Sequence, residues 1–157
     1  MTRKQMLSHL RACNEVAAIA VANGNHPFGA VLVAPDDEEI LLTQGNVDTV
    51  RHAETELSRY ASSLFPSDYL WNCTLVSSFE PCAMCSGTLY WANIGQLVYG
   101  VSEKRLLEVT GSDDRNPTLS LTCRNVLRSG QKRIKIHGPF PEIEDELLSL
   151  HADFWHH

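Results

Sequence analysis

The stretch Cys73-Thr74-Leu75-Val76-Ser77-Ser78-Phe79 runs directly into Glu80-Pro81-Cys82-Ala83-Met84-Cys85. Its first seven residues form a largely apolar run and predict a buried strand. Pro81 suits the first position of a helix, and segment 83–92 continues that helix. Cys82 and Cys85 therefore lie three residues apart at a helix start, where both sulfur atoms can face one point.

This cysteine pair is placed to bind a metal ion. The positive end of a helix dipole favours thiolates, and thiolates bind zinc at ~2.3 Å. Two cysteines leave a tetrahedral site incomplete, whereas adding one histidine leaves a single open position, as in catalytic zinc sites. His52, which also begins a predicted helix, is the candidate third ligand. A thioredoxin-like redox pair is the alternative interpretation of Cys-x-x-Cys.

Glu54 follows His52 by two residues. A carboxylate at this distance can reach water beside the metal without ligating it, so it can move a proton to a departing amine. His-x-Glu alone indicates little, because helix starts favour Glu for electrostatic reasons. In this order with Pro-Cys-x-x-Cys, and each after a predicted strand, the pair matches the known signature of zinc deaminases.

Hydrophobic periodicity predicts the elements on either side of this stretch. We expect helices at 6–20, 52–64, 119–127 and 142–155, and strands at 28–34, 40–43, 96–101 and 133–137. Thr2 is placed to cap the first helix and Gly24 to end it. Two strands followed by strands alternating with helices predict an α/β fold: three α/β/α layers with a five-stranded mixed sheet, in one domain over residues 1–157.

Composition narrows the choice of partners. The net charge is −6, from 13 basic and 19 acidic residues, and phosphate contacts need Lys and Arg, so nucleic acid is an unfavourable partner. The basic residues of segment 124–135 are interpreted as a solvated face. No apolar run approaches the ~20 residues that cross a bilayer. With no secretory signal and an odd count of five cysteines, we expect a cytoplasmic protein without a disulfide framework.

Four segments carry a resemblance to a known family. They are Pro27-Phe28-Gly29-Ala30-Val31, Gly45-Asn46, His52-Ala53-Glu54 and Glu80-Pro81-Cys82-Ala83-Met84-Cys85. Up to roughly Val101 the chain resembles the cytidine-deaminase-like superfamily, and within it the branch of guanine deaminases, fungal-type cytosine deaminases and tRNA adenosine deaminases. Segment 86–92 is most similar to the guanine-deaminase form.

The resemblance implies a role for individual residues and a fold of five strands between helices. His52, Cys82 and Cys85 would bind Zn²⁺, and Glu54 would shuttle the proton. Asn46 would hydrogen-bond the base, Phe28 would line the pocket, and the backbone around Ser78 and Glu80 would lie along the ring. Ala53 and Trp91 are further candidates for substrate contacts, although Trp91 suits core or dimer packing equally well. Members are usually homodimers. Only five residues separate Asn46 from His52, and Arg51 precedes the ligand, so the resemblance leaves the identity of the substrate open.

These features lead to an expected function. The chain should be a zinc-dependent hydrolase that deaminates a free nucleobase or close analogue (a guanine-type aminopurine, cytosine or a triazine) and releases ammonia. A tRNA adenosine deaminase, and a non-catalytic relative with structural zinc or a redox pair, are the alternatives.

Weaker candidates lie outside the motifs. We interpret His26 as an exposed turn residue. Segment 113–115 contacts substrate or is solvated, and Phe154 and Trp155 cover the site or pack a terminal helix. His151, His156 and His157 could form a second metal site, although terminal residues are usually disordered.

Overall fold

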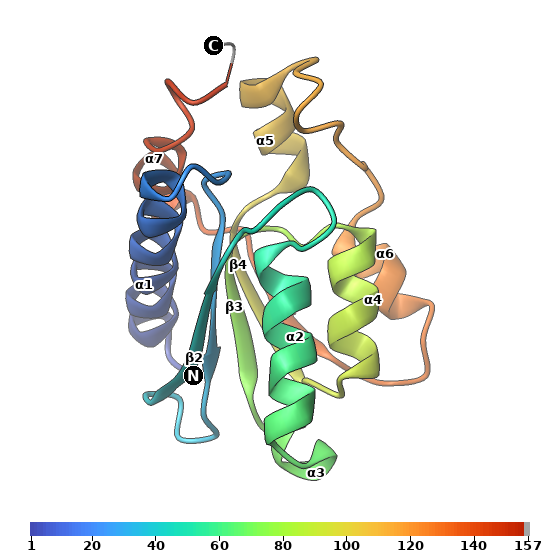
Figure 1. Ribbon diagram of the computed structural model, residues 1–157. Helices are drawn as coiled ribbons and strands as arrows, with labels where there is room; N and C mark the ends of the chain where they lie inside the picture. Colours follow the sequence, from blue (N-terminus) through green and yellow to red (C-terminus); the bar gives the residue numbers. More distant parts are fainter. Residues whose placement is uncertain (156–157) are drawn as a thin grey trace.

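The computed structural model describes residues 1–155 and shows the expected layers (Figure 1). In chain order its elements are α1 (Arg3–Ala22), β1 (Gly29–Val33), β2 (Ile40–Gly45), α2 (Ala53–Leu64), α3 (Ser67–Leu70), β3 (Thr74–Phe79), α4 (Ala83–Trp91), β4 (Gln96–Val101), α5 (Glu103–Thr110), α6 (Cys123–Arg128), β5 (Lys135–His137), a 3₁₀ turn (Pro141–Ile143) and α7 (Glu144–Leu148).

The five strands form one mixed sheet in the order β2-β1-β3-β4-β5. Strand β1 is antiparallel to both β2 and β3, while β3, β4 and β5 run parallel. Helices α1 and α7 cover one face, and α2, α4 and α6 cover the other (Figure 1). The predicted three-layer architecture and mixed sheet are confirmed.

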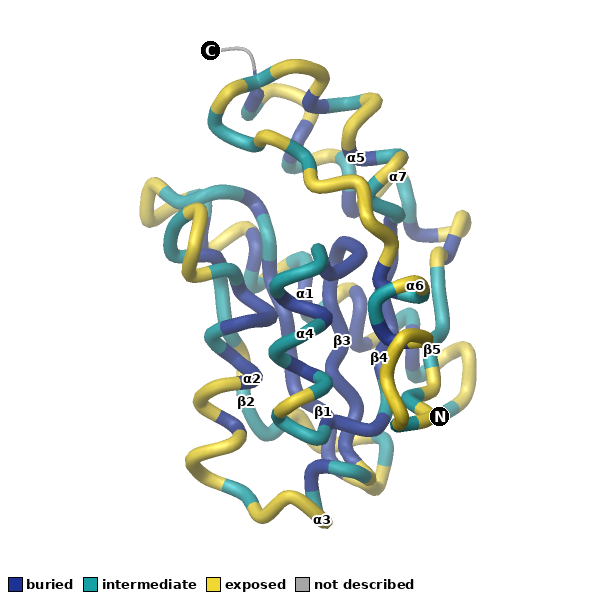
Figure 2. The backbone as a smooth tube through the Cα atoms, turned by 90° about the vertical axis from the view of Figure 1, so that its right-hand side faces the viewer, coloured by how far each residue is buried: buried dark blue, intermediate teal, exposed yellow. Residues whose placement is uncertain are grey.

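The core has two halves, one on each face of the sheet. Successive residues of a strand point to opposite faces, so Leu75 and Leu97 pack toward α2 and α4 while Val76 and Val98 pack toward α1. Every residue of β3 is buried. Figure 2 shows β3 and β4 largely in dark blue, with the exposed residues, in yellow, mostly in the outer turns and loops.

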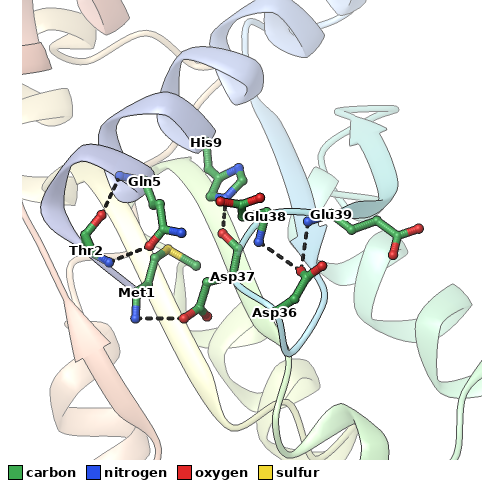
Figure 3. Close-up of polar contacts among 8 residues, drawn as sticks. All are labelled: Met1, Thr2, Gln5, His9, Asp36, Asp37, Glu38 and Glu39. Atoms are coloured by element: carbon green, nitrogen blue, oxygen red, sulfur yellow. Dashed lines mark hydrogen bonds and ion pairs between the residues drawn. The ribbon is translucent and has the colours of Figure 1, made fainter.

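The first helix starts and ends where the sequence predicted. Thr2 Oγ1 accepts a hydrogen bond from Gln5 N at 3.1 Å, and Gln5 Oε1 accepts one from Thr2 N at 2.7 Å. Gly24 follows the helix with a φ of 84°, a conformation that glycine adopts at little cost. The start of α1 also contacts the β1–β2 turn, where Asp37 forms an ion pair with the Met1 amino group and accepts a hydrogen bond from His9 Nε2 (Figure 3).

The second half of the chain departs from the predicted boundaries. Helix α5 was not predicted; Ser102 caps it by accepting from Arg105 N at 3.1 Å. The helix expected at 119–127 begins at Cys123, because Thr122 caps that turn. The terminal helix expected at 142–155 is interrupted: α7 ends at Leu148, and 149–155 form turns. Among residues 1–155, no helix has both the length and the apolar character needed to cross a membrane.

Candidate active site

Two helix starts bring the three expected metal ligands together. His52 is the residue before α2, and Cys82 is the residue before α4, with Cys85 in its first turn. These helices pack against each other on one face of the sheet (Figure 1). His52 Nδ1 lies 3.6 Å from Cys82 Sγ and 3.4 Å from Cys85 Sγ, and the two sulfur atoms are 3.6 Å apart.

These separations fit one zinc ion. Bonds of ~2.0–2.3 Å to a tetrahedral centre place neighbouring ligand atoms about 3.3–3.8 Å apart, and the observed contacts fall in that range. His52, Cys82 and Cys85 are the metal-binding cluster found among the described residues. Three protein ligands of this kind leave a fourth position for water or substrate. The predicted ligand set is therefore confirmed as a cluster that fits zinc.

The thiols are prepared for metal binding. A hydrogen bond from Cys85, opposed by burial and assisted by His52, lowers the pKa of the Cys82 thiol. The same pairing raises the pKa of Cys85, since one proton is shared between the two sulfur atoms. Thr55 Oγ1 donates to Cys85 Sγ at 3.1 Å and orients it from behind.

Glu54 lies beside this cluster, 5% exposed. Its Oε1 is 2.5 Å from Ser77 Oγ, which is also 2.6 Å from the carbonyl oxygen of Phe79. The hydroxyl of Ser77 donates toward both oxygen atoms and holds the carboxyl of Glu54 against β3. Burial raises the pKa of Glu54, which favours the uptake of a proton by the carboxyl. The side chain can therefore hold a proton close to the metal ligands.

A cavity of about 280 Å³ opens next to the cluster. His52, Cys82 and Glu54 line it, together with two of the predicted substrate residues, Phe28 and Asn46. Asn46 is buried, and its Nδ2 donates to the carbonyl oxygen of Asp48 at 3.2 Å.

Of the remaining predicted substrate residues, one lines the cavity and three do not. Glu80 lines the cavity. Ala53 is packed in the core between α2 and the sheet, and the buried hydroxyl of Ser78 accepts from Gly29 N at 3.2 Å. Trp91 is 81% exposed at the far end of α4, packed on Tyr90. Since α4 rises ~1.5 Å per residue, the structure does not bring Trp91 to the cavity.

The C-terminal segment supports the cavity from outside. Phe154 and Trp155 do not line it; their rings pack on His26, which does. His26 is consequently half-buried rather than an exposed turn residue. Arg115 also lines the cavity, paired with Asp113 at 2.6 Å and stacked on the same two aromatic rings.

His151 is not available for a second metal site. Its Nε2 is 2.8 Å from the carbonyl oxygen of Pro27, and its Nδ1 accepts from Trp155 Nε1 at 3.0 Å. Both ring nitrogens are therefore occupied, and His156 and His157 lie outside the described residues.

Sequence reasoning missed Phe79, Glu103 and Asn116 as cavity residues. Phe79 is in the motif stretch itself, but its apolar side chain suited core packing equally well. Glu103 and Asn116 are in the region where the predicted elements failed, and no spacing pattern connects them to the motifs. Arg115 belongs to segment 113–115, for which the sequence allowed either a substrate contact or a solvated loop.

Fold and site together define a zinc-type deaminase domain, and comparison with known proteins agrees. The family described as "Cytidine and deoxycytidylate deaminase zinc-binding region" matches residues 3–101. A Schizosaccharomyces pombe protein named "Probable cytosine deaminase" is 34% identical over 152 residues, covering 95% of this chain and 91% of that protein. The chain belongs to this deaminase family, whose members are zinc-dependent hydrolytic enzymes.

Other relatives differ in their named substrates. The Bacillus subtilis guanine deaminase is 38% identical over 92 residues, 56% of this chain and 58% of that protein. The Haemophilus influenzae tRNA-specific adenosine deaminase is 35% identical over 100 residues, 60% of this chain and 57% of that protein. A Nitrosomonas europaea guanine deaminase structure has the same fold, with a TM-score of 0.68 at 19% identity over 92% of this chain and 81% of that one. Membership of the family therefore leaves the substrate undecided.

Proposed function

We propose that this enzyme hydrolyses the exocyclic amine of a free nucleobase or close analogue, a guanine-type aminopurine, cytosine or a triazine, and releases ammonia. The observation that carries the proposal is the cavity of about 280 Å³ beside the His52, Cys82 and Cys85 cluster. Pockets for larger ligands run from ~300 to 1,000 Å³, so this one suits a single small heterocycle. The S. pombe relative, matched over nearly its whole length, carries a name consistent with such a substrate.

The ligand residues and Glu54 would divide the chemistry between them. His52, Cys82 and Cys85 would hold zinc, which when bound would supply an activated water by lowering its pKa toward ~7. Glu54 accepts a proton from the attacking water and delivers it to the ring nitrogen and then to the departing amine. Its burial and its contact with Ser77 keep the carboxyl in place for both transfers.

Two further residues would orient the substrate. Asn46 is buried in the cavity wall, where its amide can hydrogen-bond the polar edge of the ring. Phe28 supplies an apolar wall and is itself held edge-on by Phe79, with ring centres 5.6 Å apart. A planar ring held between Asn46 and Phe28 would present the carbon that carries its exocyclic amine to the metal cluster.

A tRNA substrate fits the chain less well. Binding an RNA arm requires free basic groups on the surface, and the net charge is −6. In the basic segment, Arg124 is engaged by the hydroxyl of Tyr99 and the carbonyl of Gly138, and Lys132 by the carbonyl of Tyr90. These two side chains are engaged within the fold, whereas Arg128, Arg133 and Lys135 are exposed, so it is the net charge that disfavours tRNA. The single domain over residues 1–157, the homodimer and the cytoplasmic location stay predictions.

The test is ammonia release from a panel of free bases, nucleosides and transcribed tRNA, with zinc content measured on the same samples. We expect turnover with at least one free base and none with tRNA. In Glu54→Gln the ligands are untouched but proton transfer is lost, so zinc content should stay equal while kcat falls at least ~100-fold. Turnover restricted to tRNA, or a fully active Glu54→Gln enzyme with normal zinc, would contradict the proposal.

A further inference from the structure

A second set of polar side chains lines the cavity and comes from a region outside the deaminase motifs. Glu103 begins α5, and Asn116 and Thr118 belong to segment 111–122 between α5 and α6. None of the three is a metal ligand or belongs to the motif stretches. Their presence in the cavity wall needs a separate explanation.

Glu103 places a carboxyl in the cavity without a protein partner. Its backbone N–H donates to Glu80 Oε1 at 3.1 Å, but its carboxyl oxygens make no hydrogen bond or ion pair within residues 1–155. Burial, reinforced by the charges of Cys82, Glu54 and Glu80, raises the pKa of Glu103 to about 8. A carboxyl in this range can either accept or donate a hydrogen bond near neutral pH.

Two polar atoms on the adjoining segment also lack partners. Asn116 Nδ2 and Thr118 Oγ1 are buried and form no hydrogen bond with the described residues. Buried polar atoms in native proteins are nearly always paired, and exceptions at a cavity wall point to a water, ion or ligand that satisfies them. The backbone of Asn116 is held, because its N–H donates to the carbonyl oxygen of Asp113 at 3.0 Å.

Segment 111–122 is fixed at both of its flanking helices. Glu80, 6% exposed, accepts from the N–H of Glu103 at 3.1 Å and from the N–H of Cys123 at 2.9 Å. The carboxylate of Glu80 thus joins the starts of α5 and α6 to the segment that carries Cys82. The polar groups of this wall are held in position relative to the metal cluster, as a substrate-recognition site requires.

We propose that Glu103 and Asn116 form a second recognition edge of the cavity, which hydrogen-bonds a heterocycle through a ring N–H and the carbonyl next to it. The inference rests on the proposed function and narrows its substrate class. The Glu103 carboxyl accepts from the ring N–H, and the Asn116 amide donates to the carbonyl oxygen. A substituent on that nitrogen, a methyl group or a sugar, removes the first bond and collides with the wall.

The test compares the zinc-loaded full chain with Glu103→Gln and Asn116→Ala. Each variant should raise KM for the best base about tenfold or more, with kcat within about threefold and zinc content unchanged. Ser120→Ala is the matched control, because Ser120 is an exposed residue of the same segment that does not line the cavity, and its KM should equal that of the parent. Unchanged KM in both Glu103→Gln and Asn116→Ala would overturn the inference.

Methyl-blocked substrates probe the same contact independently. The parent enzyme should prefer cytosine over 1-methylcytosine, or guanine over 1-methylguanine, and Glu103→Gln should reduce that preference at least fivefold. An equal preference in parent and variant would count against a role for Glu103.

Failure of this inference can be distinguished from failure of the proposed function. If the parent releases no ammonia from any base, the proposed function fails. Calorimetric binding of uracil and xanthine, the deaminated forms of cytosine and guanine, to the zinc-loaded Glu54→Gln chain then tests the Glu103 and Asn116 edge separately from catalysis. Tenfold weaker binding after adding Glu103→Gln supports the second edge, whereas equal binding, or no binding of either base, overturns it.

Discussion

Ser77 illustrates how one core hydroxyl can control a proposed catalytic carboxyl. Replacing it by alanine removes the contact to Glu54 Oε1 and leaves that buried oxygen unpaired. We expect Ser77→Ala to lower kcat about tenfold while zinc content stays the same, because the ligands are intact but the carboxyl is no longer oriented. Steady-state kinetics and metal analysis of the purified variant check this.

Ser58 provides the matched control for Ser77. Both serines are fully buried, but the hydroxyl of Ser58 makes no hydrogen bond with the described residues. Ser58→Ala removes an unsatisfied polar atom from α2, so activity and stability should be unchanged or slightly improved. If the two variants lose activity equally, the loss comes from core packing and the orienting role of Ser77 is wrong.

The metal ligands were predictable at the residue scale, and Ser77 was not. The Cys82–Cys85 spacing is local, because a helix start brings both sulfur atoms to one side within four residues. Ser77 acts across the boundary between β3 and α2, and a serine in an apolar strand gives no sign of its partner. The same reason explains why Glu103 and Asn116 were missed.

Between elements, Gly29 sets how closely α1 approaches the sheet. A Cβ at this position would lie 2.3 Å from the carbonyl oxygen of Cys13 and 2.8 Å from the backbone N of Ala17. Backbone atoms of a helix cannot move aside individually, so Gly29→Ala should destabilise the fold by about 3 kcal/mol. Urea unfolding would show this as a lower midpoint at an unchanged slope.

Gly87 is the comparison for Gly29. It lies inside α4 with no atom within 4 Å of its ideal Cβ position. Alanine there lowers the entropy of the unfolded chain and suits a helix, so Gly87→Ala should raise stability by about 0.5–1 kcal/mol. Similar effects of the two substitutions would mean that the close approach of α1 to β1 is not what Gly29 provides.

The elements on either side of the motifs followed from periodicity, and later ones were less accurate. Segments 28–34 and 73–79 are continuous apolar runs, and the structure places buried strands in both. Helix α5 is short and depends on the Ser102 cap and on Glu80, which is distant in sequence. The expected helix 142–155 is interrupted because His151 turns inward to the carbonyl oxygen of Pro27, and Trp155 follows it by donating to His151 Nδ1.

At the scale of the whole molecule, His151 joins the end of the chain to the loop before β1. Burial lowers the pKa of His151 to about 4, compared with ~6.5 in an unfolded chain. Between these values the unfolded state binds a proton that the folded state does not. This contribution to stability is complete above pH ~6.5 and is lost as the pH falls toward about 4.

Replacing this histidine should reduce the pH dependence of stability. His151→Gln can keep the hydrogen bond to Pro27 but has no group that titrates in this range. We expect the decrease in unfolding free energy between pH 7 and pH 5, measured with urea, to be smaller in the variant than in the parent. If the unfolding free energy decreases equally in parent and variant, groups other than His151 cause the pH dependence.

By itself, the sequence determined the layered α/β architecture and the paired thiols of Cys82 and Cys85, because strand alternation, helix periodicity and Cys-x-x-Cys spacing are local properties. His52 and Glu54 were assigned through their resemblance to the deaminase signature, because they are distant from the cysteines in the sequence. Only the tertiary structure decided that Glu80 joins the starts of α5 and α6, that Glu103 and Asn116 line the cavity, and that Trp91 lies far from it. These relations depend on how elements from distant parts of the chain pack together, and that packing leaves no fixed spacing in the sequence.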